Sequence, residues 1–166
     1  MATSDQELAQ TGVRLGKLLQ EQGRTIATAE SCTGGWVAKV LTDRAGSSAY
    51  VMAGLVTYSN SAKQALLGVA EETLEQYGAV SEPVVRQMVA GAIRAAGVDV
   101  AVAISGVAGP GGGTPDKPVG TVWFAWGSGP DQTRATVRHF DGDRDDVRRQ
   151  SVLFALQAVT GFLEGE

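Results

Sequence analysis

The sequence predicts an α/β fold, a three-layer α/β/α sandwich around a mixed β-sheet. Helix-like segments separate the first strand-like segments, which is typical of parallel strands whose connecting helices cover both faces of a sheet. Two consecutive strand-like segments near the C-terminus flank a turn and predict an antiparallel hairpin. With 166 residues, of which 43% are hydrophobic, the chain fits one domain of about 100–200 residues. We therefore interpret residues 1–166 as a single domain.

The first half of the chain is expected to alternate helices with strands. Ser4 and Glu7 form a capping-box pattern at the start of the first helix, and Gly23 ends it. Ser59 is expected to begin the cap of a short third helix. The predicted strands span 24–29 and 49–58, and the predicted helices span 34–42, 61–67 and 71–77.

The second half is expected to hold a central strand, a hairpin and a final helix. Ser81 caps a helix with Pro83 in its first turn, where proline is tolerated, and Gly97 ends it. The nearly continuous apolar run 98–105 is typical of a strand that is covered on both faces. The predicted hairpin pairs 119–126 with 133–140, and Asp141 or Asp143 caps a last helix whose apolar stripe reaches Leu163.

Composition excludes several classes of protein. A net charge of −4 disfavours a general nucleic-acid binder, which needs a basic stripe. No apolar run approaches the roughly 18 residues of a membrane span, and the N-terminus lacks the pattern of a signal peptide. Cys32 is the only cysteine, so no intrachain disulfide can form and a reducing compartment is favoured. We expect a cytoplasmic protein with no nucleic-acid or membrane partner.

No metal site is predicted. His139 is the only histidine, and no cluster of His and Cys has the spacing of metal ligands. Carboxylates crowd the start of the last helix, where capping and the helix dipole account for them better than a metal does. A single histidine on a strand also argues against a catalytic triad built on imidazole. The crowded carboxylates are Asp141, Asp143, Asp145 and Asp146.

Ser31 occupies the most suggestive position in the chain. It follows the first predicted strand and precedes the predicted helix at 34–42. Backbone N–H groups are unpaired at such a junction and the helix dipole is positive there, so the junction favours a phosphate, a carboxylate or an oxyanion. If Ser31 is a nucleophile, its base is not a histidine.

A glycine-rich loop follows the predicted central strand. Its segment 109–114 matches neither common phosphate-binding pattern, so it is open whether the loop holds a phosphate or is a plain flexible turn. Ligands of open α/β sheets gather beyond the carboxyl ends of strands. If the strands run in parallel, this loop and Ser31 face one crevice.

Lys63 is the candidate base among the four lysines. Lys17 and Lys39 are expected to be solvated, and Lys117 lies in the glycine-rich loop, where it could contact an anion. Lys63 falls in the first turn of a predicted helix, where the dipole opposes a cation and lowers the pKa of an ammonium group. A neutral lysine can act as a general base. The alternative is a surface lysine at a fraying helix end.

Several segments together resemble the CinA C-terminal domain family, whose characterised enzymatic members are nicotinamide mononucleotide amidases. The resemblance extends over about residues 7–163. Full-length members carry a large N-terminal domain that this chain lacks, so the resemblance is to the standalone form. The segments that carry it are 28–35 (TAESCTGG), 54–60 (GLVTYSN), 62–69 (AKQALLGV), 106–122 (GVAGPGGGTPDKPVGTV) and 140–150.

The resemblance implies a serine amidohydrolase with a Ser/Lys dyad. In it Ser31 is the nucleophile and Lys63 the base. Tyr58 matches an active-site tyrosine that bonds to the dyad or the substrate, although it could merely end a strand. Ser105 stands where relatives often carry threonine and keeps the hydroxyl. Arg144 matches an arginine that we assign to the substrate phosphate, with surface pairing to Asp141 or Asp145 as the alternative.

The expected reaction is hydrolysis of nicotinamide mononucleotide to nicotinate mononucleotide and ammonia, without cofactor or metal. The expected partner is therefore a small pyridine nucleotide, and a homodimer is possible by family analogy. Backbone N–H groups among Thr33, Gly34 and Gly35 are expected to stabilise the oxyanion. The ribose phosphate is expected to lie against Arg144 and the loop 106–113, with its glycines Gly106, Gly109 and Gly111, and Ser105 is expected to contact the substrate.

Three alternatives stay open at this point. Cys32 is a rival nucleophile, because a helix N-terminus lowers the pKa of a thiol. The chain could be a non-catalytic nucleotide-binding or regulatory module, which would need neither Ser31 nor Lys63. It could also be a hydrolase of a different amide, with the same dyad in a different pocket.

Overall fold

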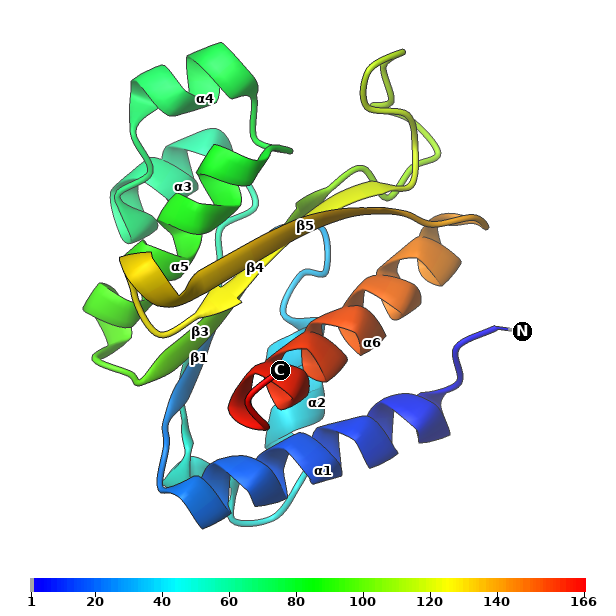
Figure 1. Cartoon of the computed structure of the whole chain (residues 1–166). Coiled ribbons are helices and arrows are strands. Elements are labelled where there is room, and N and C mark those ends of the chain that lie inside the picture. Colours follow the sequence, from blue (N-terminus) through cyan, green and yellow to red (C-terminus); the bar gives the residue numbers. More distant parts are fainter. Residues whose placement is uncertain (1) are drawn as a thin grey trace.

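A single mixed sheet organises the protein. The computed structural model describes residues 2–166, and within them five strands pair in the order β2-β1-β3-β4-β5. β1 runs parallel to β2 and β3, whereas β4 is antiparallel to β3 and β5. Helices α1, α2 and α6 cover one face, and α3, α4 and α5 cover the other (Figure 1). The predicted three-layer sandwich around a mixed sheet is confirmed.

The elements follow the predicted order closely. The helices are α1 (Asp5–Gln22), α2 (Trp36–Thr42), α3 (Asn60–Leu67), α4 (Glu71–Tyr77), α5 (Glu82–Ala96) and α6 (Arg144–Leu163), with two further 3₁₀ turns at Ser47–Ala49 and Pro130–Gln132. The strands are β1 (Ile26–Glu30), β2 (Val51–Val56), β3 (Val100–Gly106), β4 (Thr121–Gly127) and β5 (Thr133–His139).

The central strand β3 explains why the molecule has two hydrophobic cores. Its side chains alternate between the two faces of the sheet. Val100, Val102 and Ile104 enter the core beneath α1, α2 and α6, and Ala101 and Ala103 enter the core beneath α5. The apolar run that predicts a strand covered on both faces is indeed the middle strand of the sheet.

Side-chain caps begin three of the helices as expected. Ser4 accepts a hydrogen bond from Glu7 N–H, and Ser59 accepts one from Ala62 N–H, both at 3.1 Å. Asp143, and not Asp141, caps α6 in a complete capping box. At α1 the expected box is only half formed, because among residues 2–166 no bond runs from the Glu7 side chain to Ser4 N–H.

The start of α2 differs from the prediction. The helix begins at Trp36 and not at residue 34, because Gly34 and Gly35 have φ angles of +61° and +96°. Those angles lie in the left-handed region, which a right-handed helix cannot contain and which glycine adopts at little cost. Residues 31–35 therefore form a tight turn between β1 and α2.

One edge of the sheet collects the segments that sequence analysis singled out. The carboxyl ends of the parallel strands β1 and β3 meet there, and α6 begins at the same edge. The glycine-rich loop between β3 and β4 projects from this edge (Figure 1). The beginning of α3 joins it through the connection that follows β2.

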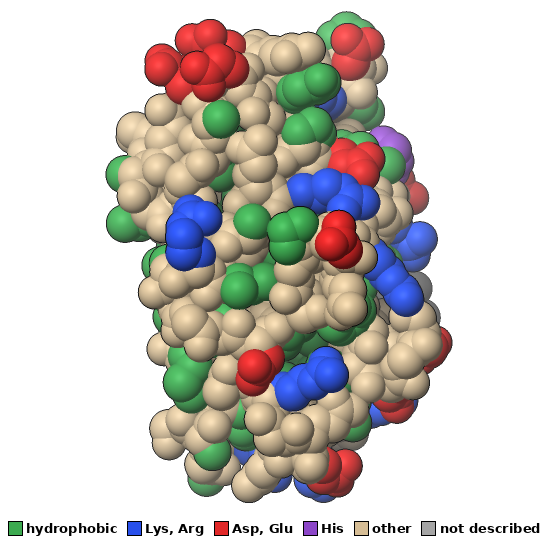
Figure 2. All heavy atoms as spheres, turned by 60° about the vertical axis from the view of Figure 1, so that its left-hand side comes forward, with side chains coloured by type: hydrophobic (Ala, Val, Ile, Leu, Met, Phe, Trp, Pro, Cys, Tyr) green, Lys and Arg blue, Asp and Glu red, His purple; other side chains and the backbone are tan. Residues whose placement is uncertain are grey.

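The surface over α4 is acidic. Figure 2 shows acidic side chains gathered at the top of the molecule, where α4 lies, and this helix contains Glu71, Glu72 and Glu75. Lys117, from the glycine-rich loop, donates to the carbonyl of Tyr77 at 2.6 Å and so ties the loop to the C-terminal end of α4. Among the helices of residues 2–166, none has the length and apolar character that crossing a bilayer requires.

Candidate active site

Ser31 lies at the junction of β1 with the following turn. Its N–H donates to the carbonyl of Ile104 at 3.0 Å, and its carbonyl accepts from Gly34 N–H at 3.0 Å. These bonds anchor the residue to the neighbouring strand and to its own turn. Ser31 is buried, so its hydroxyl is partly shielded from solvent.

Lys63, on α3, contacts Ser31 at the end of β1. Its Nζ lies 3.0 Å from Ser31 Oγ and donates to the carbonyl of Thr57 at 2.7 Å. The Lys63 side chain is only 1% exposed, so the alternative of a surface lysine is wrong. Two residues 32 positions apart in the chain are thus in direct contact.

The position of Lys63 depends on how α3 is held. Ser59 caps the helix, and its carbonyl accepts from Lys63 N–H at 3.1 Å. Farther along, α3 crosses α5 at Gly91, where a Cβ atom would lie 1.9 Å from the carbonyl oxygen of Leu67. A glycine at this crossing lets the two helices approach closely enough for Lys63 to reach the serine.

Burial has opposite chemical effects on Lys63 and Cys32. Desolvation disfavours the charged form of each group. It lowers the pKa of Lys63 below its usual 10.5, which favours the neutral amine. It raises the pKa of Cys32 from 9.0 to about 11, which keeps the thiol protonated. The rival nucleophile is therefore in its unreactive form at neutral pH.

Two charged residues that the sequence analysis left without a role hold the Ser31 turn from opposite sides. Glu30 is fully buried, and its carboxylate accepts from Thr33 Oγ1 at 2.7 Å and from the N–H groups of Val37 and Ala38 at 3.0 Å. Arg148, on α6, donates from Nε to the carbonyl of Cys32 at 3.0 Å and from Nη2 to the carbonyl of Thr33 at 3.2 Å. The only signal for Arg148 in the sequence is its i,i+4 spacing from Arg144, which places both on one helix face.

Several backbone donors of the turn have no hydrogen-bond partner within the described residues. Within residues 2–166, no hydrogen bond engages the N–H groups of Cys32, Thr33 or Gly35. Gly34 was among the expected oxyanion donors, but its N–H already donates to the Ser31 carbonyl within the turn. The expectation is corrected on this point, and Cys32 N–H takes its place among the available donors.

Tyr58, Arg144 and the glycine-rich loop meet at the first turn of α6. Arg144 donates to the carbonyl of Gly109 at 2.8 Å and to the hydroxyl of Tyr58 at 3.1 Å. Tyr58 is 63% exposed and lies two residues beyond the end of β2. Arg144 pairs with neither Asp141 nor Asp145, since Asp145 is bonded to Arg149. We call this arrangement of Tyr58, Arg144 and Gly109 the bridge.

Ser105 and Gly106 end β3 next to Ser31. The register pairs Glu30 with Ile104, so Ser105 is the β3 neighbour of Ser31, and it is almost fully buried. At Gly106 a Cβ atom would lie 2.7 Å from Val122 Cγ2, which explains the glycine. Gly111 has open space around it and stands free on the loop.

A hollow of about 500 Å³ lies beside the bridge, between the glycine-rich loop and the first turn of α6. Its walls are partly apolar and include the Arg144 side chain, so it offers room for a small organic ligand. The residues that line it are Ala108, Pro110, Val119, Gly142, Asp143, Arg144 and Asp145.

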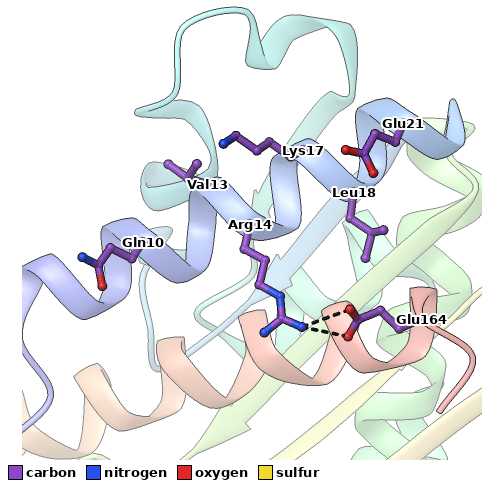
Figure 3. Close-up of a pocket in the computed structure, with 7 residues that line it drawn as sticks. All are labelled: Gln10, Val13, Arg14, Lys17, Leu18, Glu21 and Glu164. Carbon is purple, nitrogen blue, oxygen red and sulfur yellow. Dashed lines mark hydrogen bonds and ion pairs between the residues drawn. The ribbon is translucent and has the colours of Figure 1, made fainter.

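A second hollow, of about 430 Å³, lies between α1 and the end of α6 (Figure 3). Arg14 forms an ion pair with Glu164 at 3.0 Å, and Lys17 and Glu21, which also lie on α1, line the same hollow. Glu164 follows the last turn of α6, whose length of 20 residues puts it roughly 30 Å from the first turn. This hollow is therefore remote from Ser31 and carries no nucleophile.

The remaining sequence candidates do not gather into a metal site. Across residues 2–166, no group of three or more His, Cys, Asp or Glu residues is placed to hold a metal ion. His139 is exposed on the edge strand β5. Asp143 and Asp146 serve the α6 cap, and Asp145 serves an ion pair with Arg149.

Comparisons with known proteins agree on one family. A model of the CinA C-terminal domain matches residues 8–163. The chain is 56% identical over 156 residues to the nicotinamide-nucleotide amidohydrolase PncC of Escherichia coli K12, covering 94% of each chain. It is 54% identical over 146 residues to the protein of the same name from Pseudomonas putida, covering 88% of this chain and 91% of the relative.

Solved structures give the same result. A crystal structure of a CinA superfamily protein from Klebsiella pneumoniae superposes with a TM-score of 0.91 at 41% identity. The match covers 96% of this chain and 99% of the other. A competence/damage inducible protein from Agrobacterium tumefaciens also reaches a TM-score of 0.91, at 39% identity, with 98% and 99% covered.

Proposed function

Because the chain belongs to the CinA C-terminal domain family, we propose that it hydrolyses nicotinamide mononucleotide to nicotinate mononucleotide and ammonia, with Ser31 as nucleophile and Lys63 as base. The names of relatives from Escherichia coli and Pseudomonas putida support this substrate. The observation that carries the proposal is the buried contact of 3.0 Å between Lys63 Nζ and Ser31 Oγ. A module that only binds a nucleotide has no need for such a pair.

The first half-reaction forms an acyl-enzyme. The carbonyl of Thr57 accepts one N–H of Lys63, and a neutral amine at 3.0 Å from Ser31 can direct its lone pair at the serine proton. As Oγ attacks the carboxamide carbon, Lys63 takes this proton and the carbonyl oxygen becomes an oxyanion. The available N–H groups of Cys32 and Thr33 stabilise that oxyanion. Protonated Lys63 then donates to the departing nitrogen, the C–N bond breaks and ammonia leaves.

The second half-reaction returns the enzyme to its starting state. Lys63, neutral again, takes a proton from a water molecule whose oxygen attacks the acyl carbon. When the tetrahedral intermediate collapses, the proton passes from Lys63 to Ser31 Oγ and the nicotinate product is released. One water is consumed and one ammonia is formed, so the atoms balance without a redox partner.

The bridge and the adjacent hollow suit the nucleotide part of the substrate. Arg144 presents a planar cation at the mouth of the crevice, which matches the geometry of a phosphate. Within residues 2–166, the N–H groups of Gly109 and Gly111 make no hydrogen bond, so the loop can add donors. We assign the ribose phosphate to this region and the pyridine carboxamide to the dyad.

Ammonia release by purified variants tests the proposal. Ser31→Ala and Lys63→Met are expected to lose activity on nicotinamide mononucleotide by about 10³-fold or more, as removal of a nucleophile or its base does elsewhere. Lys39→Met is the matched control, because Lys39 is an exposed lysine paired with Asp43. Near-normal turnover by Ser31→Ala would refute the dyad, and an inactive wild-type protein would refute the substrate.

A further inference from the structure

Arg148 makes contacts that suggest a role in catalysis beyond its place on α6. Its guanidinium is half-buried and uses two of its nitrogens on two successive carbonyls of the Ser31 turn, those of Cys32 and Thr33. The same group lies 5.3 Å from the centre of the Trp36 ring, which restricts its orientation. Residues 115 and 116 positions apart are joined by these bonds, so α6 holds the turn directly.

The geometry of the peptide bond carries the effect of Arg148 to the site. The carbonyl of Cys32 and the N–H of Thr33 belong to one planar trans peptide and point in opposite directions. A donor that fixes the carbonyl therefore fixes the direction of the N–H on the other side. That N–H belongs to the second residue after Ser31, and no hydrogen bond among residues 2–166 occupies it. A cation on the carbonyl also polarises the peptide and strengthens its N–H as a donor.

The turn needs such a restraint because of its glycines. Gly34 and Gly35 adopt left-handed φ angles, and glycine has more alternative conformations than any other residue. Glu30 restrains the side of the turn that faces α2. Arg148 restrains the side that faces α6, where a Cβ atom on Gly34 would lie 3.2 Å from Arg148 Nη2.

We propose that Arg148 is a positioning residue that holds the Cys32–Thr33 peptide so that Thr33 N–H is directed at the oxyanion of the tetrahedral intermediate. The proposal rests on the proposed function, in which Ser31 is the nucleophile. Because Arg148 acts on a donor that matters only when negative charge develops, it affects the transition state and not the binding of the substrate.

The test compares Arg148→Met with Arg149→Met. Arg149 is a matched control: it lies 5.1 Å from the same Trp36 ring, but it pairs with Asp5 and Asp145 and makes no hydrogen bond to the turn. Loss of one oxyanion donor costs about 10²–10³ in kcat, and misdirection of one is expected to cost about 10- to 100-fold. We expect this fall in kcat for Arg148→Met, with KM for nicotinamide mononucleotide and the pH midpoint unchanged. Arg148→Lys, which keeps one donor, is expected to recover part of the loss.

A second measurement does not depend on activity. In ¹H–¹⁵N spectra, the amide signal of Thr33 is expected to shift in Arg148→Met and to stay in place in Arg149→Met. A rise in KM at constant kcat, equal losses in both variants, or an unmoved Thr33 signal would each overturn the role of Arg148. Failure of the proposed function has a different signature: the Thr33 signal would still shift in Arg148→Met, but Ser31→Ala would release ammonia as fast as wild type.

Discussion

At the scale of single residues, the same desolvation makes Lys63 reactive and Cys32 inert. An amine is a base only when it is uncharged, and a thiol is a strong nucleophile only when it is charged. Burial removes charge from both, so it prepares the lysine and disables the cysteine. The environment therefore favours Ser31 over Cys32 as the proposed nucleophile, although intrinsic nucleophilicity favours the thiol.

The pH dependence of activity is expected to report the pKa of Lys63. Only the neutral amine accepts the Ser31 proton, so kcat/KM should rise with pH through the pKa of Lys63 and then level off. Because burial lowers this pKa, the rise should be centred below 10.5. Ammonia release measured from pH 5 to pH 10 checks this, with circular dichroism to show that the fold is retained. A profile that falls over the same range would contradict the assignment of Lys63 as base.

Lys63 also makes stability depend on pH in a defined direction. Its pKa is lower in the folded protein than the value of 10.5 expected when the chain unfolds, so unfolding takes up a proton between those two values. The free energy of unfolding of the wild type should therefore increase as pH rises from the lowered pKa towards 10.5. This increase is lost when pH falls through the lowered pKa. Lys63→Met lacks this contribution, so its stability relative to wild type should decrease as pH rises. Urea unfolding at several pH values measures the difference in free energy of unfolding between Lys63→Met and wild type. For the control Lys39→Met, this difference should not change with pH.

Cys32 should react slowly with alkylating reagents while the protein is folded. A pKa raised from 9.0 to about 11 lowers the thiolate fraction near pH 8 by roughly 100-fold, and only the thiolate reacts. Labelling by iodoacetamide, followed by mass spectrometry, should be slower by at least this factor than labelling in urea. Equal rates in the two conditions would show that Cys32 is exposed and ionisable.

At the scale of elements, the crossing of α3 and α5 determines whether Lys63 meets Ser31. Leu67, at the end of α3, lies directly over Gly91, and Arg94 of α5 donates to the Leu67 carbonyl at 3.3 Å. At this crossing the backbone of α5 packs directly against the backbone of α3, which leaves no room for a side chain at position 91. The base is thus positioned by a helix that contributes no reacting group.

Gly91→Ala is expected to damage both the fold and the activity. The added Cβ would lie 1.9 Å from the Leu67 carbonyl oxygen, so α3 must move away from α5 and carry Lys63 with it. Overpacking of this kind costs about 1–3 kcal/mol, and kcat should fall while the protein is still folded at the assay temperature. Thermal unfolding and ammonia release measure the two effects.

Gly161→Ala is the matched control for that substitution. Gly161 is also a helical glycine, but a Cβ there would find its nearest atom at 3.5 Å. Alanine is favoured over glycine in a helix by up to about 1 kcal/mol, and Gly161 is half-buried in the last turn of α6. We therefore expect Gly161→Ala to be stabilised and fully active. A similar loss of kcat in Gly161→Ala and Gly91→Ala would show that the crossing of α3 and α5 does not explain the loss.

The elements themselves were largely predictable because local rules determine them. Ser4, Ser59 and Asp143 cap helices as their side chains suggest, and the apolar run of β3 identifies the middle of the sheet. The start of α2 was wrong by two residues, because a pair of glycines leaves the backbone conformation undetermined until the turn is packed.

At the scale of the whole molecule, the candidate site joins segments from the entire chain. β1, the start of α3, the loop after β3 and the first two turns of α6 each contribute. Motifs within one segment were visible in the sequence, but contacts between segments were not. Arg148 was missed for this reason, because it has its role only when α6 folds against the Ser31 turn. Glu30 was missed although its bonds are local, because they form only once residues 31–35 make a turn and bring α2 back onto the carboxylate.

Arg144 offers a test of how these segments recognise the substrate as a whole. If it binds the phosphate, Arg144→Gln should raise KM for nicotinamide mononucleotide by about 10-fold or more, since charge-assisted bonds contribute about 1.5–3 kcal/mol. It should leave KM for nicotinamide riboside, which has no phosphate, nearly unchanged. Arg134→Gln, an exposed arginine on β5, is the control. Equal effects on both substrates would move the phosphate to another part of the crevice.

The arrangement of α6 has a practical consequence for anyone who attaches this protein to a support. The helix starts beside Arg144 and the glycine-rich loop and ends near Glu166, at the other end of the same face of the sheet. A handle placed after Glu166 would therefore leave the crevice facing outward, open to diffusing molecules. A handle at the N-terminal end would emerge close to Asp5, which pairs with Arg149 in the first two turns of α6, one helical turn from Arg144 and next to Arg148.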